Sequence, residues 1–397
     1  MNASSDPSRT PVVIAALRTP IGRVNGSLAA VEPASLAALL IERIIDDTGL
    51  DRAEIDDVIL GNAANSAGNL ARLAALEARL PVAVPGVTVD RQCGSGLEAI
   101  VLAARQIQAG AGRFYLAGGA ESASRAHIRL RPPVARGEEL QPVKRARMAP
   151  DFIGDPDMGV AAENVAAACG VSRERQDRFA LESHRRAIAS EAAGRFARET
   201  VPVPMPSGAV AKDECPRANA SAETLARLKP VFVKGGTVTA GNACPINDGA
   251  AMVLVTNLAE ARRLGVSFAL EFVDAATAGV DPNLLGLGPV PAMAKLRGRH
   301  PGLHLGDVDV IEFNEAFASQ VLGSLDQLEI APSRVNRDGG AIALGHPYGA
   351  SGAILVVRLF SQMLEAASAS QGLALMGVGG GMGMVAHFRS IGADQLA

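Results

Sequence analysis

The pattern of apolar and polar positions is dominated by short β-branched runs that lead through a turn into a helix-type run. The stretch from Val87 to Ile100 shows this best, because β-type residues come first, glycines follow, and apolar residues at helical spacing come last. Such runs predict a buried strand, a tight turn and an amphipathic helix in succession. A chain built of these units is typical of the α/β class.

Three pairs of segments repeat in the same order along the chain. In each pair, a segment from the first half of the chain has the same strand-like or turn-like pattern as a segment from the second half. The pairs are residues 54–62 with 306–314, residues 89–91 with 335–337, and residues 114–120 with 373–381. Their shared order and similar spacing indicate an internal duplication of an α/β unit. The duplication would put Cys93 and His346 at equivalent turns, after a strand and before a helix, where open α/β sheets bind ligands.

A stretch of different composition, from about Ser124 to Gly241, separates the two copies and is rich in proline and arginine. It contains helix-type segments over residues 159–168 and 172–193. Ser172, followed by an acidic residue in the first turn, is a typical start of a helix. Inserted segments of this kind commonly cover active sites or make contacts between subunits.

Composition narrows the class of protein. The chain has 397 residues, of which 48% are hydrophobic and 20% charged, so it is globular and long enough for two or three domains. A net charge of −3 gives no reason to expect nucleic acid or an anionic membrane as a partner. There is no apolar run of about 18 residues, which predicts no membrane span. The polar residues 1–10 are expected to be a frayed tail and not a signal peptide.

The cysteines and histidines do not suggest a metal site. Four cysteines and six histidines are scattered along the chain without a CxxC pair. Cysteines without an evident pairing pattern fit the reducing cytosol.

Cys93 is the first candidate for chemistry, because it falls at the turn of a strand–turn–helix unit. Free backbone N–H groups and the helix dipole at a helix N-terminus favour the thiolate, which is a nucleophile. Gly94 and Gly96 would let a bulky electrophile approach the backbone closely. The alternative is a small buried hydrophobic residue at a strand–helix junction.

His346 lies in the second glycine-rich turn, between Gly345 and Pro347, on a backbone expected to be stiff and exposed. A neutral imidazole there could accept the proton of a thiol or donate to an oxyanion, and otherwise it satisfies a local carbonyl. Asn314, at the end of a strand, could orient a water or donate to a developing negative charge. Its structural alternative is a turn residue or a helix N-cap.

The glycine run from Gly377 to Gly383 follows the last repeated strand. It is not a dinucleotide fingerprint, because no acidic partner lies about 20 residues further on. Its backbone N–H groups could face a substrate carbonyl oxygen. Alternatively, the run is a loop that needs positive φ angles at several positions.

Together these residues make the chain resemble the thiolase family over essentially its whole length. The motifs that carry the resemblance are Cys93-Gly94-Ser95-Gly96, Thr239-Ala240-Gly241-Asn242, Asn247-Asp248-Gly249-Ala250-Ala251, Asn314-Glu315-Ala316-Phe317, Gly345-His346-Pro347 and Gly379-Gly380-Gly381-Met382-Gly383. The resemblance implies the α/β thiolase fold, with two duplicated βαβαβαββ halves in a five-layer α-β-α-β-α arrangement. The expected domains are an N-terminal half over residues 1–123 and 243–271, an inserted loop domain over residues 124–242, and a C-terminal half over residues 272–397.

The same resemblance implies an acyltransferase that acts on coenzyme A thioesters by a ping-pong mechanism. Cys93 would attack the thioester and hold the acyl group, and His346 would activate Cys93. His346 and a water held by Asn314 would form one oxyanion hole, and the backbone N–H groups of Cys93 and Gly379 would form the other. The residues expected to line the acyl and pantetheine channel or to contact coenzyme A are Met158, Phe232, Ala240, Cys244 and Phe317.

The resemblance implies no tightly bound cofactor and no metal, since coenzyme A and acyl-CoA are substrates. It also implies a homodimer, or a homotetramer built as a dimer of dimers, without nucleic acid or membrane partners. The expected location is the cytoplasm and the expected context is fatty acid metabolism.

One departure from the family pattern concerns Gly377, where members usually have a cysteine that acts as acid/base on the second acyl-CoA. A glycine cannot transfer a proton, and loss of a positioned acid/base typically costs about 10²–10⁴-fold in rate. We therefore expect acylation of Cys93 to remain and carbon–carbon bond formation or cleavage to be slow or altered. Smaller departures are Asp157 in place of a usual histidine, Gly235 in place of an aspartate, and Cys244, a further candidate for the missing base, in place of a serine.

Two other functions stay open on these residues. Cys93 could pass its acyl group to an amine, an alcohol or water, or condense it with a β-carboxylated donor whose decarboxylation replaces deprotonation. The chain could also be a coenzyme A-binding subunit without catalytic activity.

Overall fold

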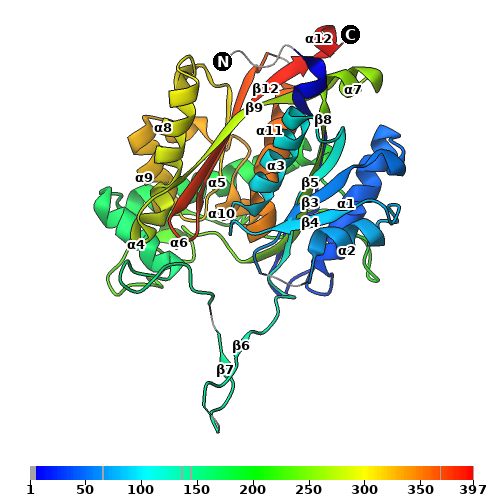
Figure 1. The fold of residues 1–397 in the computed structure, drawn as a ribbon. Coiled ribbons are helices and arrows are strands. Elements are labelled where there is room, and N and C mark those ends of the chain that lie inside the picture. The colour runs from blue at the N-terminus through cyan, green and yellow to red at the C-terminus, as the bar shows by residue number, and fades with distance from the viewer. Residues whose placement is uncertain (1–5, 65–66, 136, 144, 367, 397) are drawn as a thin grey trace.

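Two β-sheets face each other across a pair of central helices, and further helices cover both outer faces (Figure 1). This arrangement is seen in a computed structural model that describes residues 6–64, 67–135, 137–143, 145–366 and 368–396. The five layers confirm the predicted α-β-α-β-α architecture.

The order of the main elements is the same in both halves of the chain, except that the second half has no strand equivalent to β4 among the described residues. The first half contains β1 (Pro11–Arg18), α1 (Pro33–Thr48), β3 (Asp57–Gly61), α2 (Leu70–Glu77), β4 (Gly86–Val89), α3 (Ser95–Ala109), β5 (Phe114–Ser122) and β8 (Asn247–Asn257). The second half contains β9 (Phe268–Gly279), α8 (Pro289–Arg299), β10 (Val310–Phe313), α9 (Ala318–Leu328), α11 (Tyr348–Glu365), β11 (Gln371–Val378) and β12 (Met382–Gly392). The smaller elements are β2 (Gly22–Arg23), α6 (Ala222–Ala226), α7 (Leu258–Arg263), α10 (Ala341–Leu344), α12 (Ala393–Leu396) and single 3-10 turns.

Strand pairing follows the duplication. The strands run in the order β10-β11-β12-β9-β1-β8-β5-β3-β4, with β2 paired to β8, so each half keeps its strands together. β1 and β9 join the two sheets through Val12 with Glu271 and Val13 with Leu270 only. β3 pairs in parallel with β4, whereas the second half has a single parallel bridge from Ile311 to Val335 at the equivalent place. The repeat seen in the sequence thus corresponds to equivalent elements of the fold.

The two central helices, α3 and α11, approach each other through glycines. A Cβ atom on Gly96 would lie 2.7 Å from the Gly349 carbonyl oxygen, and one on Gly352 would lie 2.5 Å from the Leu97 nitrogen. Such distances exclude any side chain at these positions without a shift of the backbone. The close approach brings the N-terminal ends of the two helices together, and with them the turns that carry Cys93 and His346.

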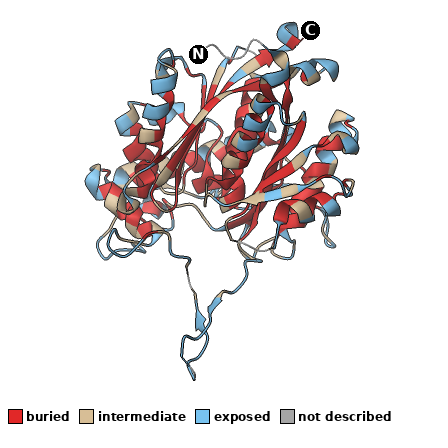
Figure 2. Cartoon of the chain, viewed as in Figure 1, coloured by how far each residue is buried: buried red, intermediate tan, exposed pale blue. Residues whose placement is uncertain are grey.

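Buried residues fill the space between the layers, and the outer surfaces of the outer helices are exposed (Figure 2). The central core contains the inner faces of α3 and α11 and the apolar faces of both sheets. Burial on both faces explains why the strand β8 is buried over its whole length.

The segment between β5 and β8 contains the helices predicted there. α4 runs over Met158–Ala168 and α5 over Arg173–Ala192, and the Ser172 hydroxyl oxygen accepts a hydrogen bond from the Arg175 N–H as the N-cap. A hairpin of β6 (Leu130–Arg131) and β7 (Gln141–Pro142) extends away from the body and is exposed (Figures 1 and 2). The chain re-enters the sheet at β8.

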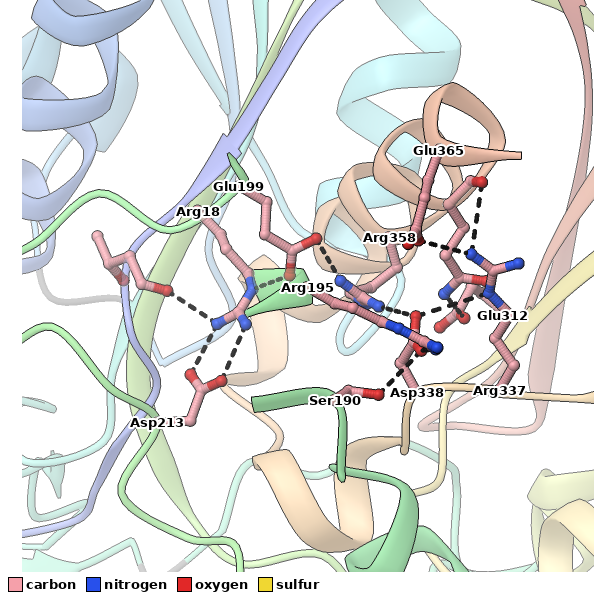
Figure 3. Close-up of polar contacts among 12 residues, drawn as sticks. Arg18, Ser190, Arg195, Glu199, Asp213, Glu312, Arg337, Asp338, Arg358 and Glu365 are labelled. Carbon is pink, nitrogen blue, oxygen red and sulfur yellow. Dashed lines mark hydrogen bonds and ion pairs between the residues drawn. The ribbon is translucent and has the colours of Figure 1, made fainter. Parts of the chain in front are cut away.

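Buried arginines and carboxylates tie this segment to both halves (Figure 3). Arg18, at the end of β1, pairs with Glu199 and Asp213 at 2.7 Å each. Arg358, on α11, pairs with Glu199 and with Asp338. Because Glu199 contacts both arginines, one carboxylate of the intervening segment links the two halves of the duplication.

The N-terminus differs in part from the expected frayed tail. Pro7–Arg9 form a 3-10 turn whose N-cap, Asp6, accepts a hydrogen bond from the Ser8 N–H. Residues 1–5 of that predicted tail lie outside the described residues. The division into three domains stays a prediction, and its boundary after residue 271 would fall within β9. None of the described helices has the length and apolar character needed to cross a bilayer.

Candidate active site

The turn that carries Cys93 is held in a constrained conformation between β4 and α3. Gln92 adopts a φ of 48°, an uncommon value for a residue with a side chain. The Ser95 hydroxyl accepts a hydrogen bond from the Arg91 N–H at 2.8 Å and donates to the Gln92 carbonyl at 2.6 Å. These bonds fix the thiol one residue before the N-cap of α3, Gly94.

Burial controls the charge of the Cys93 thiol. Removal from water raises its pKa to about 11, although the N–H groups of Gly379 and of Cys93 itself favour the thiolate. Desolvation outweighs these N–H groups, so the resting thiol keeps its proton and is not the thiolate that its place at a helix terminus suggested. The N–H of Gly379 faces the sulfur, and its role in an oxyanion hole stays a prediction.

His346 is buried and not exposed as the glycine-rich turn suggested, because the Ile246 backbone pairs with it and α11 follows directly. Residues 341–344 of that turn form the short helix α10, so His346 follows a helix and not a strand. Gly345 has a φ of 118°, which requires a glycine. The His346 N–H donates to the Asn247 side-chain oxygen at 2.8 Å.

The two ring nitrogens of His346 have different surroundings. Nδ1 lies 2.6 Å from the Ser351 hydroxyl oxygen, and Nε2 is buried without a hydrogen-bond partner among the described residues. Burial lowers the pKa of His346 to about 4, so the ring is neutral near pH 7. If Nδ1 donates to Ser351, the unpartnered Nε2 is a proton acceptor.

One cavity of about 420 Å³ contains both groups. Of the residues predicted for the site, those that line it are Cys93, Met158, Phe232, Ala240, Cys244, Phe317, His346 and Gly379. Residues far apart in the sequence are held together here by main-chain contacts. Ala243 pairs with Phe317, and the Cys244 N–H donates to the Ala316 carbonyl at 3.0 Å.

The wall of the cavity is largely apolar on one side. The rings of Phe232 and Phe317 meet edge to face with centroids 6.1 Å apart, and Met158 lies at the start of α4 beside them. Phe232 is 43% exposed, so this pair lies where the cavity meets the surface. An apolar lining with few polar groups is typical of a site for a small molecule.

Asn314 is the predicted site residue that does not line this cavity. It lines a separate narrow space together with Gly345 and Ser351. Its Nδ2 is buried and has no partner within the described chain. Asn314 is not the helix N-cap that the structural alternative suggested, because the N-cap of α9 is Phe317. The neighbouring Glu315 has a structural role, since it accepts hydrogen bonds from Ser183, Asn336 and the Ile342 N–H.

Gly377 lines the cavity, and a side chain there would point at an amide. A Cβ atom on Gly377 would lie 3.2 Å from Nε2 of Gln320 and 3.4 Å from the Gly286 backbone. Both polar atoms of the buried Gln320 side chain have no partner in the described residues. Sequence reasoning missed Gln320, although it lies three residues after the Asn314-to-Phe317 motif.

Tyr348 is a second cavity residue that sequence reasoning missed. Its ring meets the His346 ring edge on with centroids 5.5 Å apart, and it is the first residue of α11. Burial, followed by repulsion from Cys244 and Cys93, raises the pKa of its hydroxyl. The sequence could have indicated Tyr348 as a site residue, because it lies only two residues after His346.

The arrangement can support nucleophilic chemistry at sulfur. A neutral thiol and a neutral imidazole line one cavity, one imidazole nitrogen has no hydrogen-bond partner among the residues described, and a backbone N–H faces the sulfur. A thiol is activated when an adjacent base takes its proton as it attacks. No group of histidine, cysteine and carboxylate side chains able to hold a metal ion exists among the described residues.

Comparison with known proteins relates the whole chain to one family. A family profile described as "Thiolase, N-terminal domain" matches residues 11–259, and one described as "Thiolase, C-terminal domain" matches residues 266–390. The chain is 44% identical over 382 residues to "Putative acetyl-CoA C-acetyltransferase VraB" of Staphylococcus epidermidis, covering 96% of this chain and 98% of that protein. The protein of the same name from Staphylococcus aureus is 45% identical over 379 residues, covering 95% and 98%.

A solved structure agrees with these relatives. The crystal structure of the Bacillus anthracis acetyl-CoA acetyltransferase superposes with a TM-score of 0.88 at 36% sequence identity, covering 96% of this chain and 99% of that one. Both the fold and the sequence therefore match along nearly the full length. The chain belongs to the thiolase family and is an acyltransferase.

Proposed function

We propose that the protein transfers acyl groups from coenzyme A thioesters through an acyl-Cys93 intermediate. The observation that carries this proposal is the shared cavity of Cys93 and His346, with Nε2 of His346 free and the Gly379 N–H facing the sulfur. His346 takes the thiol proton as Cys93 attacks the thioester carbonyl. The N–H groups of Cys93 and Gly379 stabilise the resulting oxyanion.

The relatives named as acetyl-CoA acetyltransferases support acetyl-CoA as the first substrate to test. Incubation with acetyl-CoA followed by intact-mass measurement should detect one acetyl group on the protein. Cys93→Ala should abolish the adduct, and Cys169→Ala, which changes a cysteine outside the cavity, should keep it. Absence of an adduct on the unmodified protein would refute the proposal.

We propose further that thiolysis of 3-oxoacyl-CoA and its reverse condensation are slow, because no thiol occupies the position of Gly377. A β-carbon fits at position 377 if the neighbouring Gln320 side chain moves by a few tenths of an ångström, since its amide nitrogen is the nearest atom at 3.2 Å. Gly377→Cys should therefore raise kcat for thiolysis of acetoacetyl-CoA about tenfold or more. Gly377→Ala adds the same β-carbon without the thiol and should give no increase.

A second candidate function follows from the same position. If Gly377→Cys adds nothing and acetoacetyl-CoA is not cleaved, acyl-Cys93 passes its acyl group to a non-carbon acceptor or to a β-carboxylated donor. Acyl transfer from the isolated acyl-enzyme to amines, alcohols, water or malonyl-CoA, followed by mass spectrometry, separates these acceptors. A subunit without catalytic activity would form no adduct that turns over.

A further inference from the structure

Ionisable side chains in the cavity are few, and each can be examined in turn. Those among the lining residues are Cys93, Asp157, Cys244, His346 and Tyr348. Under the proposed function, Cys93 and His346 are occupied with forming and breaking the acyl-sulfur bond. A carbon–carbon bond step also needs a group that gives a proton to, or takes one from, the carbon next to the thioester carbonyl.

Asp157 does not fit that role. Its side chain is 73% exposed and its carboxylate pairs with Arg145 at 3.1 Å, so it lies at the mouth of the cavity in contact with water. A carboxylate that is engaged by an arginine and open to water is not positioned for proton transfer inside the cavity.

Cys244 is the other buried candidate. Burial, then the negative charges that Cys93, Glu315 and Cys215 would carry, raise the pKa of its thiol, and burial likewise raises the pKa of the Tyr348 hydroxyl, so the pKa shifts do not separate these two groups. No cation is among the groups that act on it, and its own backbone N–H faces the sulfur. Its side chain is short, and its backbone is held by the pairing of residues 243 and 244 with Phe317 and Ala316.

Tyr348 lines the cavity, and its hydroxyl makes no hydrogen bond within the part of the chain that the structure describes. The ring is fixed by its edge-to-face contact with His346 and by its place as first residue of α11. Burial holds this hydroxyl in its protonated form, so it enters the carbon–carbon bond step as a proton donor.

We propose that Tyr348 is the proton-transfer residue of the carbon–carbon bond step. This inference rests on the proposed function, because it acts on the acyl-CoA that reacts with acyl-Cys93. In this proposal, the phenol of Tyr348 has the role that a thiol at position 377 would otherwise have, and both positions line the same cavity.

The proton balance closes without a further reactant. In thiolysis, the Cys93 sulfur adds to the 3-oxo carbonyl, and collapse of the adduct breaks the bond to the α-carbon and leaves an enolate. The Tyr348 hydroxyl gives its proton to that α-carbon, whose electron pair forms the new C–H bond. The phenolate then takes the proton of the incoming coenzyme A thiol, the coenzyme A sulfur attacks acyl-Cys93, and the leaving Cys93 sulfur regains its proton from His346.

Exchange of the α-hydrogens of acetyl-CoA with D₂O isolates this step, because it requires proton transfer at carbon and no net reaction. We expect the unmodified protein to incorporate deuterium and Tyr348→Phe to do so at least about 10²-fold more slowly. Tyr115→Phe is the matched control, since it removes the hydroxyl of the chain's other tyrosine, in β5, and should leave exchange within about twofold.

Acetylation of Cys93 by p-nitrophenyl acetate, whose leaving group needs no proton, shows whether the rest of the site is intact. Tyr348→Phe should be acetylated within about threefold of the normal rate, and adding Gly377→Cys to it should restore exchange. Unchanged exchange in Tyr348→Phe would assign both proton transfers to His346 and overturn the inference. Loss of exchange in Cys244→Ala with normal exchange in Tyr348→Phe would assign the step to Cys244, and no exchange by the unmodified protein would also overturn it. The proposed function fails separately, through the absence of an acetyl group on Cys93.

Discussion

At the scale of single residues, the pair formed by Cys93 and His346 is neutral before substrate arrives. Burial raises the pKa of the thiol to about 11 and lowers the pKa of the imidazole to about 4. The proton therefore stays on sulfur between these values. Its transfer to His346 has to accompany attack on the substrate and does not precede it.

Alkylation of Cys93 by iodoacetamide should follow this charge state. Because only the thiolate reacts, the rate should rise roughly tenfold per pH unit from about pH 7 to about pH 10 without a plateau. Intact mass measures the rate, and Cys93→Ala corrects for the other cysteines. A plateau near neutral pH would mean that thiolate and imidazolium coexist in the resting protein.

The positions of Cys93 and His346 could be predicted from sequence because each follows a local rule. Both lie at glycine turns before a helix, and the repeat relates the two turns. Gln320 and Tyr348 could not be predicted in this way. Their importance comes from where their side chains converge, and that depends on how segments distant in sequence pack.

At the scale of elements, Glu121 fixes the end of β5 to two other segments. Its buried carboxylate accepts hydrogen bonds from the Ala63 N–H at 2.8 Å, the Gly349 N–H at 3.0 Å and the Asn62 side chain at 2.7 Å. The bond to Gly349 reaches the first turn of α11, which follows His346 directly. One carboxylate thus holds the loop after β3 and the start of a helix in the other half.

Replacement of Glu121 by alanine should lower the free energy of unfolding by about 3 kcal/mol, because several buried N–H groups lose their acceptor. Urea unfolding followed by circular dichroism measures this loss. Glu139→Ala, at an exposed loop position, should change the free energy by less than about 0.5 kcal/mol. A loss below about 1 kcal/mol for Glu121→Ala would show that water replaces the carboxylate.

Elements with a strong period were predictable and short ones were not. The strands that end at Gly61 and Phe313, and the helices α4 and α5, correspond to the predicted segments. The helix α10 was missed, since a four-residue apolar stretch between glycines has no helical period to detect. Its helical turns depend on the packing of residues 341–344 in the core.

At the scale of the whole molecule, ionised side chains are buried where the three parts of the chain meet. The network around Arg18 and Arg358 lies beside Glu312 of β10, which accepts a hydrogen bond from Gln362 (Figure 3). Burial raises the pKa of Glu312 from 4.5 to about 8. The folded protein therefore keeps a proton on this carboxyl that the unfolded chain releases.

This difference predicts how stability changes with pH. Above about pH 4.5 the unfolded carboxyl ionises, so the folded state loses relative stability as pH rises toward about 8, where the folded carboxyl ionises too. The glutamine in Glu312→Gln does not titrate, so this variant does not lose stability through this position as pH rises. Its melting temperature relative to the unmodified protein should therefore be higher at pH 8 than at pH 5.5, as measured by calorimetry. An equal difference at both pH values would show that Glu312 ionises normally.

The duplicated architecture could be predicted from three repeated segments, because equivalent segments adopt equivalent structure. The salt-bridge network could not. Its members come from β1, α11, the segment between β5 and β8 and, with Asp338, the turn before α10. They share no local sequence pattern, and charged residues are usually exposed, so the sequence alone gives no sign that these are buried.

The contact of Gly96 with the first turn of α11, and of Gly352 with α3, has a consequence for how such chains diverge. Any methyl group added at one position would separate the two helices unless the opposing helix receded in the same step. Substitutions there should therefore be inherited jointly in descendant sequences. A recombinant that took only one half from a distant homologue would combine helices that do not fit, and the turns that carry Cys93 and His346 would be misaligned. The two halves are therefore expected to evolve together.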